Sequence, residues 1–371
     1  MNLLIEKANL LESLTNVMRG ISPRNIIPIL NGVKFDLTNE GLSITASDSD
    51  LVINAFIPKD KIKKIEKTGT IVIQSKYLLE IIRKLPNTDI KIEVVDGLKI
   101  IISTDSTVYN LNCLNTADYP QLNFEKSKQP IVIASDVLKK VIHQTIFAVS
   151  TQESRPLLTG LNFKINGNIL ECIATDSYRL AKKTITLDEQ YDSYDLVIPG
   201  KNINELDKII SGDGNVEIHP FNNKIIFVYE NYQFQSSLLS GSYPNTANLI
   251  PSDFEIILTT SLNSYFSAID RAALLTQNKD KNIVKMETKA SELLITSYAS
   301  EIGKVEETVS INKSSSKDLS ISFSSKYMLE ALKTLEDEEL LILLNTDSKP
   351  IVLKSTKDES LIQLILPIKT Y

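Results

Sequence analysis

The chain carries one short segment three times at a constant interval. Each copy starts with a small residue followed by lysine and continues with helical apolar spacing; the copies are residues 75–85, 200–210 and 325–335. Their lysines Lys76, Lys201 and Lys326 are 125 residues apart each time. This interval is too long for a solenoid repeat and matches the size of a whole domain. We therefore expect three similar domains rather than one large enzyme core.

Length and composition agree with several domains. The 371 residues exceed what one hydrophobic core usually serves, and the apolar (42%) and charged (23%) fractions are ordinary for a globular protein. No apolar run of about 18 residues occurs and the N-terminal segment has no signal core, so we expect a cytoplasmic protein without a membrane partner. Cys113 and Cys172 are too few for a disulfide framework or a cysteine metal site.

Each third shows the same order of helix and strand signals. Amphipathic helices come first, and their apolar residues fall on one face; they are expected at 10–19, 135–149 and 262–273. Strand pairs follow, and in the central third Asn166-Gly167-Asn168 predicts a hairpin turn between two strands. The lysine-marked helix and further strands complete a unit that reads βαβββ and then αβββ.

Antiparallel strands with two helices on one face predict an α+β fold. Polar segments at 124–129 and 251–254 separate the thirds. We therefore expect domains at residues 1–124, 125–252 and 253–371.

The predicted helices are more basic than the rest of the chain. Residues 75–85 carry +2, residues 135–149 and 324–335 carry +1 each, and the other three helices are neutral. The net charge is −6, so the helices hold +4 and the remainder −10. A basic helical face on an acidic protein is suited to a polyanion, although lysines that only solvate helix surfaces give the same count.

Signals for enzyme chemistry are weak. His143 lies in an amphipathic helix and His219 precedes a proline, and neither has cysteines or carboxylates at metal-ligand spacing. Asp48-Ser49 and Asp176-Ser177 occupy equivalent repeat positions after a strand, which favours a turn over a nucleophile. Gly212-Asp213-Gly214 lacks the Lys-Ser/Thr of a phosphate loop. We expect no catalytic residues, cofactor or metal.

Five further segments, together with the repeat, resemble the bacterial sliding clamp family, the beta subunit of DNA polymerase III. The resemblance covers the whole chain and is carried by Arg24 to Leu30, Arg155 to Gly160, Ala174 to Ala181, Ser242-Tyr243-Pro244 and Leu364 to Tyr371. It implies a head-to-tail homodimer in which six domains close a ring, with sheets outside and helices lining a hole for duplex DNA. Phosphate contacts without base contacts would allow sliding.

The resemblance also implies a pocket between the second and third domains that binds short linear peptides of the polymerase alpha subunit, other polymerases, the clamp loader and repair proteins. An apolar groove with few polar anchors is suited to peptide capture. The expected lining is Leu158, Thr175, Ser177, Tyr178, Arg179, Leu180, Pro244, Leu249, Leu364, Leu366, Pro367 and Ile368. Without the resemblance, these leucines read as ordinary core. Clamps often have Gly-His at Ser177-Tyr178 and Arg at Asn248, so peptide preference is open.

Two more residue sets follow. Family positions and helix charge give the residues expected to face DNA: Arg24, Lys76, Arg83, Lys84, Lys139, Lys140, Gln152, Arg155, Lys201, Lys326 and Lys333. The dimer interface is expected to join a first-domain edge strand to a third-domain helix end, with glutamates opposite basic residues: Tyr109, Leu111, Leu274, Leu275, Glu301, Glu306 and Glu307. Pairing edge strands between subunits also hides exposed edges. The rival interpretation is an interaction scaffold built from the same repeats that does not encircle DNA.

Overall fold

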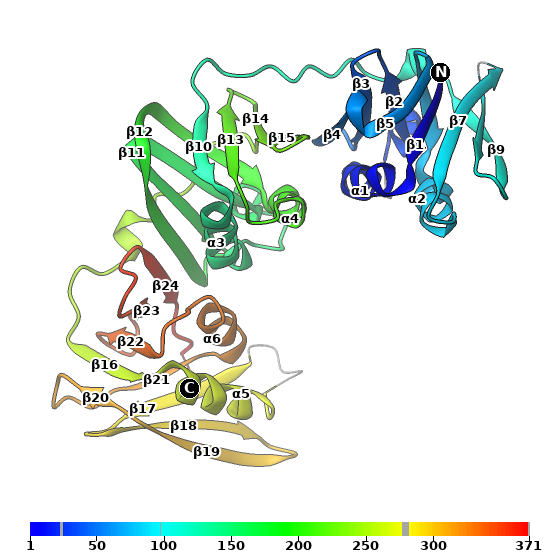
Figure 1. The fold of residues 1–371 in the computed structure, drawn as a ribbon. Helices are drawn as coiled ribbons and strands as arrows, with labels where there is room; N and C mark the ends of the chain where they lie inside the picture. The colour runs from blue at the N-terminus through cyan, green and yellow to red at the C-terminus, as the bar shows by residue number, and fades with distance from the viewer. Residues whose placement is uncertain (23–24, 97, 277–281, 370–371) are drawn as a thin grey trace. The chain divides into compact units, whose positions relative to one another are not determined.

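A computed structural model describes residues 1–371 except 23–24, 97, 277–281 and 370–371 (Figure 1). By its internal contacts, the chain divides into two compact units. Unit 1 comprises residues 1–136 and 205–238, and unit 2 comprises 137–204 and 239–371. Among the described helices, none has the length and apolar character needed to cross a membrane.

The first repeat has two helices and nine strands. The helices are α1 (Lys7–Val17) and α2 (Ser75–Lys84). The strands are β1 (Asn2–Glu6), β2 (Gly32–Leu37), β3 (Gly41–Ser47), β4 (Leu51–Pro58), β5 (Ile62–Lys67), β6 (Gly69–Gln74), β7 (Asp89–Asp96), β8 (Lys99–Ser103) and β9 (Val108–Leu114).

The central and third repeats follow the same order. The central repeat contains β10 (Ile131–Ala134), α3 (Ser135–Thr145), β11 (Gly160–Thr175), β12 (Arg179–Pro199), α4 (Gly200–Ile209), β13 (Asn215–Pro220), β14 (Lys224–Tyr229) and β15 (Tyr232–Ser237). The third contains β16 (Ile256–Ser261), α5 (Leu262–Ala273), β17 (Ile283–Thr288), β18 (Glu292–Ala299), β19 (Gly303–Ser310), β20 (Asn312–Lys313), β21 (Ser320–Ser324), α6 (Ser325–Leu332), β22 (Glu339–Leu344), β23 (Ile351–Ser355) and β24 (Leu361–Ile365). The six predicted helices are all present.

Unit 1 is built on one antiparallel sheet that runs from the first repeat into the central one. Its strand order is β10-β13-β14-β15-β4-β3-β2-β6-β9-β8-β7-β1-β5. The two repeats meet where β15 pairs with β4, with Phe234 opposite Ile53. Helix α1 packs on β3, β4 and α2 and buries Leu10, Leu14 and Val17.

Unit 2 repeats this arrangement for the central and third repeats. One sheet has the order β11-β12-β24-β23-β22-β16-β20, and the repeats meet where β12 pairs with β24, with Leu180 opposite Leu364. A second sheet has the order β19-β18-β17-β21. Helices α5 and α6 pack together over both sheets, and Tyr265, Phe323 and Met328 are fully buried in the core they share. Thus, at each in-chain junction, adjacent repeats are joined by main-chain strand pairing.

The number of strands differs from the predicted βαβββ-αβββ unit. Among the described residues, five strands separate the two helices of the first repeat and those of the third, where three were predicted. One of the extra strands in the first repeat is β5, which was missed because its isoleucines, Ile62 and Ile65, are three residues apart rather than two. They face Ile5 and Leu3 of β1 across a register shift. A β-bulge thus produces a spacing that strand periodicity does not predict.

The structure also differs from the hairpin turn predicted at Asn166-Gly167-Asn168. This segment lies inside β11, which continues from Gly160 to Thr175 and pairs with β12. The register shifts on both sides of Gly167, whose φ of +63° is left-handed. The glycine therefore serves a local irregularity within a long strand rather than the end of a short one.

Candidate functional site

The turn between β11 and β12 presents Tyr178. Asp176 Oδ1 accepts hydrogen bonds from the backbone N–H groups of Tyr178 (2.9 Å) and Arg179 (3.0 Å), and Ser177 has a left-handed φ of +79°. The first repeat builds the same turn: Asp48 Oδ1 accepts hydrogen bonds from the backbone N–H groups of Asp50 and Leu51, and Ser49 has a φ of +83°. The prediction that both Asp-Ser pairs serve turns is confirmed. Tyr178 is 59% exposed as a result.

The C-terminal segment runs beside this turn. The Leu366 N–H donates to the Tyr178 carbonyl (2.8 Å), and the Ile368 N–H donates to the Ser322 carbonyl (2.7 Å). A cavity of about 600 Å³ lies here; its lining is Tyr178, Asn282, Ser324, Lys326, Tyr327, Leu366, Pro367, Ile368 and Lys369. Four of the predicted pocket residues therefore come together, within unit 2, at a cavity lined by both apolar and polar side chains, two of them lysines.

Other predicted pocket residues lie in the protein core. Leu158, Leu180 and Leu364 are 6%, 2% and 3% exposed and belong to one hydrophobic cluster drawn from the central and third repeats. Thr175 is buried as well, and its hydroxyl donates to the Arg179 carbonyl (2.6 Å). The burial of Leu158, Leu180 and Leu364 agrees with the interpretation of these leucines as ordinary core.

Arg179 is buried and fully engaged by protein groups. Its Nε donates to Asp176 Oδ2 (3.0 Å), one terminal nitrogen donates to the Phe147 carbonyl (2.6 Å), and the other pairs with Glu330. The guanidinium also stacks on the rings of Phe147 (5.2 Å) and Tyr327 (4.5 Å). Arg179 therefore connects the Tyr178 turn to α6.

Pro244 and Leu249 do not line the same cavity. Pro244 lines a separate hollow of about 260 Å³ with Tyr243 and Ile250. Leu249 ends a single helical turn and is 50% exposed. Conversely, sequence reasoning missed Tyr327 as a pocket residue, although the repeated Ser-Lys-Tyr segment places it at the start of α6.

The residues expected to face DNA lie on helices and one loop, and most are exposed. Lys76, Arg83 and Lys84 are on α2, Lys139 and Lys140 on α3, Lys201 on α4, Lys326 on α6 and Lys333 just after it; Gln152 and Arg155 precede β11. Several have protein partners. Arg83 pairs with Glu80, and Arg155 donates to Ser177 Oγ (2.8 Å). Arg24 lies outside the described residues.

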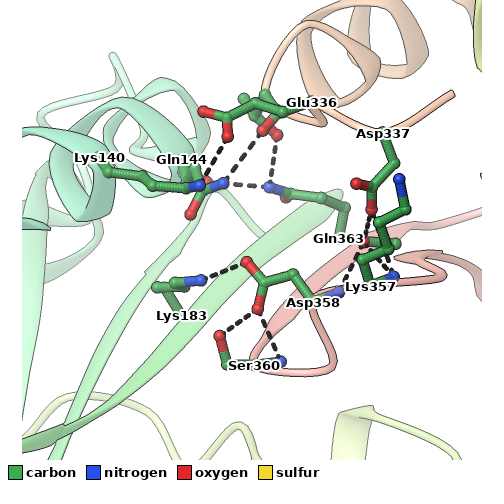
Figure 2. A network of polar contacts seen from close by, with 11 residues as sticks. Lys140, Gln144, Lys183, Glu336, Asp337, Lys357, Asp358, Ser360 and Gln363 are labelled. Carbon is green, nitrogen blue, oxygen red and sulfur yellow. Dashed lines mark hydrogen bonds and ion pairs between the residues drawn. The ribbon is translucent and has the colours of Figure 1, made fainter.

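Lys140 belongs to a polar network between the central and third repeats, within unit 2 (Figure 2). Its ammonium bonds Glu336 (2.6 Å), which raises the pKa of Lys140. Lys183 bonds Asp358 (2.5 Å) in the same region. Gln363, which is 1% exposed, donates to the Gln144 carbonyl and to a threonine hydroxyl, both at 2.9 Å. Lys140 thus forms an ion pair between the central and third repeats, and this contact is separate from its expected role in facing DNA.

The expected dimer residues lie on strand edges and at a helix end. Tyr109 and Leu111 are on β9, which pairs with β8 along residues 108–112 but with β6 only at Cys113 and Leu114. At the end of α5, Leu274 is 61% exposed and Leu275 is half-buried. The outer edge of β19, and the edge of β9 opposite β8 along residues 108–112, therefore have no strand partner among the described strands.

The expected glutamates are partly engaged already. Glu307 accepts two hydrogen bonds from Arg271, both 2.7 Å, which lower the pKa of the carboxyl. Glu306 pairs with Lys304 on the same strand. Glu301 is exposed in the turn before β19. In the described part of the chain, no group of three or more His, Cys, Asp or Glu side chains is arranged to hold a metal.

Three family models of the DNA polymerase III beta subunit match the chain. Its N-terminal domain matches residues 1–123, its central domain 132–245 and its C-terminal domain 247–369. The chain is 41% identical to the beta sliding clamp of Bacillus subtilis and 38% identical to that of Staphylococcus epidermidis, with full coverage of both chains. The crystal structure of the Bacillus subtilis DNA polymerase sliding clamp superposes with a TM-score of 0.97 over all of both chains.

Proposed function

We propose roles for the surfaces of this chain on one premise: it belongs to the DNA polymerase III beta subunit family. It has the three-domain clamp fold and is a DNA sliding clamp, a non-catalytic processivity factor that works with DNA and a polymerase. The observation that carries this function is 41% identity over the full length of a beta sliding clamp. The roles below go further than that identity.

The cavity at Tyr178, Tyr327 and Leu366 binds short linear peptides of the polymerase alpha subunit, other polymerases, the clamp loader and repair proteins. Exposed aromatic and apolar side chains beside two lysines support this role, because such a surface captures apolar anchors and orients an acidic or carboxyl group. Leu158, Thr175, Arg179, Leu180 and Leu364 shape the site from below. Ser177, Pro244, Leu249, Pro367 and Ile368 complete the proposed surface.

Two copies close a head-to-tail ring. Within the chain, β4 pairs with the last strand of the next repeat, β15, and β12 pairs with the last strand of the following repeat, β24. The corresponding strand of the third repeat, β19, keeps one open edge, and the last strand of the first repeat, β9, keeps one edge open along residues 108–112. Pairing them between copies repeats the two in-chain junctions and leaves neither edge exposed.

The proposal also covers the domain bounds, the residues that face DNA and the location of the protein in the cell. The domains are 1–124, 125–252 and 253–371. The residues proposed to face the duplex are Arg24, Lys76, Arg83, Lys84, Lys139, Lys140, Gln152, Arg155, Lys201, Lys326 and Lys333. The protein acts in the cytoplasm, on the nucleoid.

Loading tests the encircling function. A cognate clamp loader places the protein on a nicked circular plasmid, which is then cut at a distant site. We expect retention on the circle and release after cutting, because a ring slides off free ends. Protein that stays on linear DNA, or never associates, contradicts encirclement and favours the scaffold interpretation.

The interface has a separate test. Replacing both Leu274→Asp and Leu275→Asp puts two charges at the end of α5 and should give monomers in analytical ultracentrifugation. The same substitutions at two exposed positions outside the interface, Val132→Asp and Ile169→Asp, serve as the control. If the double variant of Leu274 and Leu275 stays dimeric, the assignment of the α5 end to the interface is wrong.

A further inference from the structure

A glutamate recurs four residues after each repeated lysine. Glu80 follows Lys76, Glu205 follows Lys201, and Glu330 follows Lys326. The three carboxylates occupy the same position in α2, α4 and α6, the second helix of each repeat. Because the three glutamates are at equivalent positions, we expect their carboxylates to make similar contacts.

Two of the three carboxylates accept an arginine from the preceding repeat. Glu205 pairs with Arg19, which follows α1 of the first repeat, at 3.3 Å. Glu330 pairs with Arg179, the first residue of β12 in the central repeat. Each pair lies where the two repeats join, beside β4–β15 in unit 1 and β12–β24 in unit 2.

The two junctions also match in their main-chain bonds. The Ser237 N–H donates to the Asp50 carbonyl at 2.7 Å, and the Leu366 N–H donates to the Tyr178 carbonyl at 2.8 Å. In each case the donor lies at or just beyond the end of the last strand of one repeat, and the acceptor lies in the β-turn of the repeat before it. The glutamate–arginine pair is thus one part of a junction that the chain builds twice.

Glu80 belongs to the first of the three repeats. Its ion pair is with Arg83 on the same helix, and the side chain of Glu80 is 54% exposed. The other charged residues of α2 are basic, namely Lys76, Arg83 and Lys84. A carboxylate on a helix that faces DNA repels phosphate, so its position calls for a different contact.

We propose that Glu80 accepts a basic side chain from the third repeat of a second copy, making a third junction of the same kind. This inference rests on the ring dimer proposed above. By analogy with Arg19 after α1 and Arg179 at the start of β12, the donor comes from the end of α5 or the start of β19. The described basic residues there are Arg271 and Lys304, now paired with Glu307 and Glu306.

The test is the dissociation constant of the dimer, measured by sedimentation at low salt. Glu80→Gln should weaken the dimer about tenfold, because a ring holds two such pairs and each is worth as much as an exposed ion pair. Glu66→Gln is the matched control: it removes another exposed glutamate of the first repeat that already has an ion-pair partner, in this case Lys64. The control should leave the constant unchanged.

Charge reversal identifies the donor. Glu80→Lys should weaken the dimer more than Glu80→Gln, and combining it with Arg271→Glu or Lys304→Glu should restore affinity in one of the two. Failure of both combinations, or equal constants for wild type and Glu80→Gln, overturns the role of Glu80 while leaving the dimer in place. A wild-type protein that is monomeric throughout instead contradicts the proposed ring. Unchanged thermal midpoints for the single variants exclude a folding defect.

Discussion

Replacing Arg179 should be among the most damaging single changes in unit 2. In Arg179→Met, the aliphatic volume remains but three donors and two ring contacts are lost. Asp176 is left with a side chain only 11% exposed, and Glu330 with one 32% exposed. Removing one partner of a buried ion pair costs about 3–5 kcal/mol. Because solvent rehydrates Glu330, we expect about 3–4 kcal/mol.

A cost of this size is easily measured. For a unit of this size it lowers the thermal midpoint by about 6–16 °C, which calorimetry resolves. Arg179→Lys keeps the charge but not the planar fork, so it should lose about half as much. Binding of a labelled peptide from the cognate polymerase should weaken in parallel, because Tyr327 loses the guanidinium on which it stacks. A Met variant that melts within about 2 °C of wild type and binds peptide normally refutes the reasoning.

Three further changes have defined outcomes. Leu366 is 37% exposed in the cavity wall, and Leu366→Asp should weaken peptide binding at least about tenfold in fluorescence anisotropy without lowering the thermal midpoint. The exposed control Ile169→Asp should leave peptide binding unchanged. Glu307 has its pKa lowered from 4.5 by Arg271, so the pair stabilises fully above that pH and less as the pH falls through the lowered pKa. Glu307→Gln should therefore flatten the acid limb of a pH-stability profile, and an unchanged limb would count against the pair. Ser49→Gly should raise stability by about 0.5–1 kcal/mol in urea unfolding, since glycine adopts a φ of +83° without strain, and Ser177→Gly should gain less because Arg155 loses its hydroxyl acceptor.

Local pattern was enough for the helices and for the two Asp-Ser turns, but not for the hairpin turn predicted at residues 166–168. The apolar stripe of α2 buries Leu78 and Ile82 as its spacing predicts, and both Asp-Ser turns follow from residues that act on their own backbone. The pattern failed at β5, where a bulge changes the strand period. It also could not show that β15 pairs with β4, because that pairing joins residues far apart in the chain.

The site was predicted in part for a similar reason. Tyr178 and Leu366 came from recognisable motifs, but the cavity depends on how the C-terminal segment folds back onto Ser322. Tyr327 enters the cavity only through that contact, so its helix position alone did not reveal it. Arg179 was named as lining, yet a sequence does not distinguish an arginine that is exposed to a ligand from one enclosed by Asp176 and Phe147.

The ladders β4–β15 and β12–β24 contain five residue pairs each, so neighbouring repeats are joined by main-chain bonds independently of the connecting peptide. Proteolytic nicking within 124–129 should therefore yield fragments that copurify. Insertions in the connecting segments are consequently far less damaging than a single proline placed in β4 or β24.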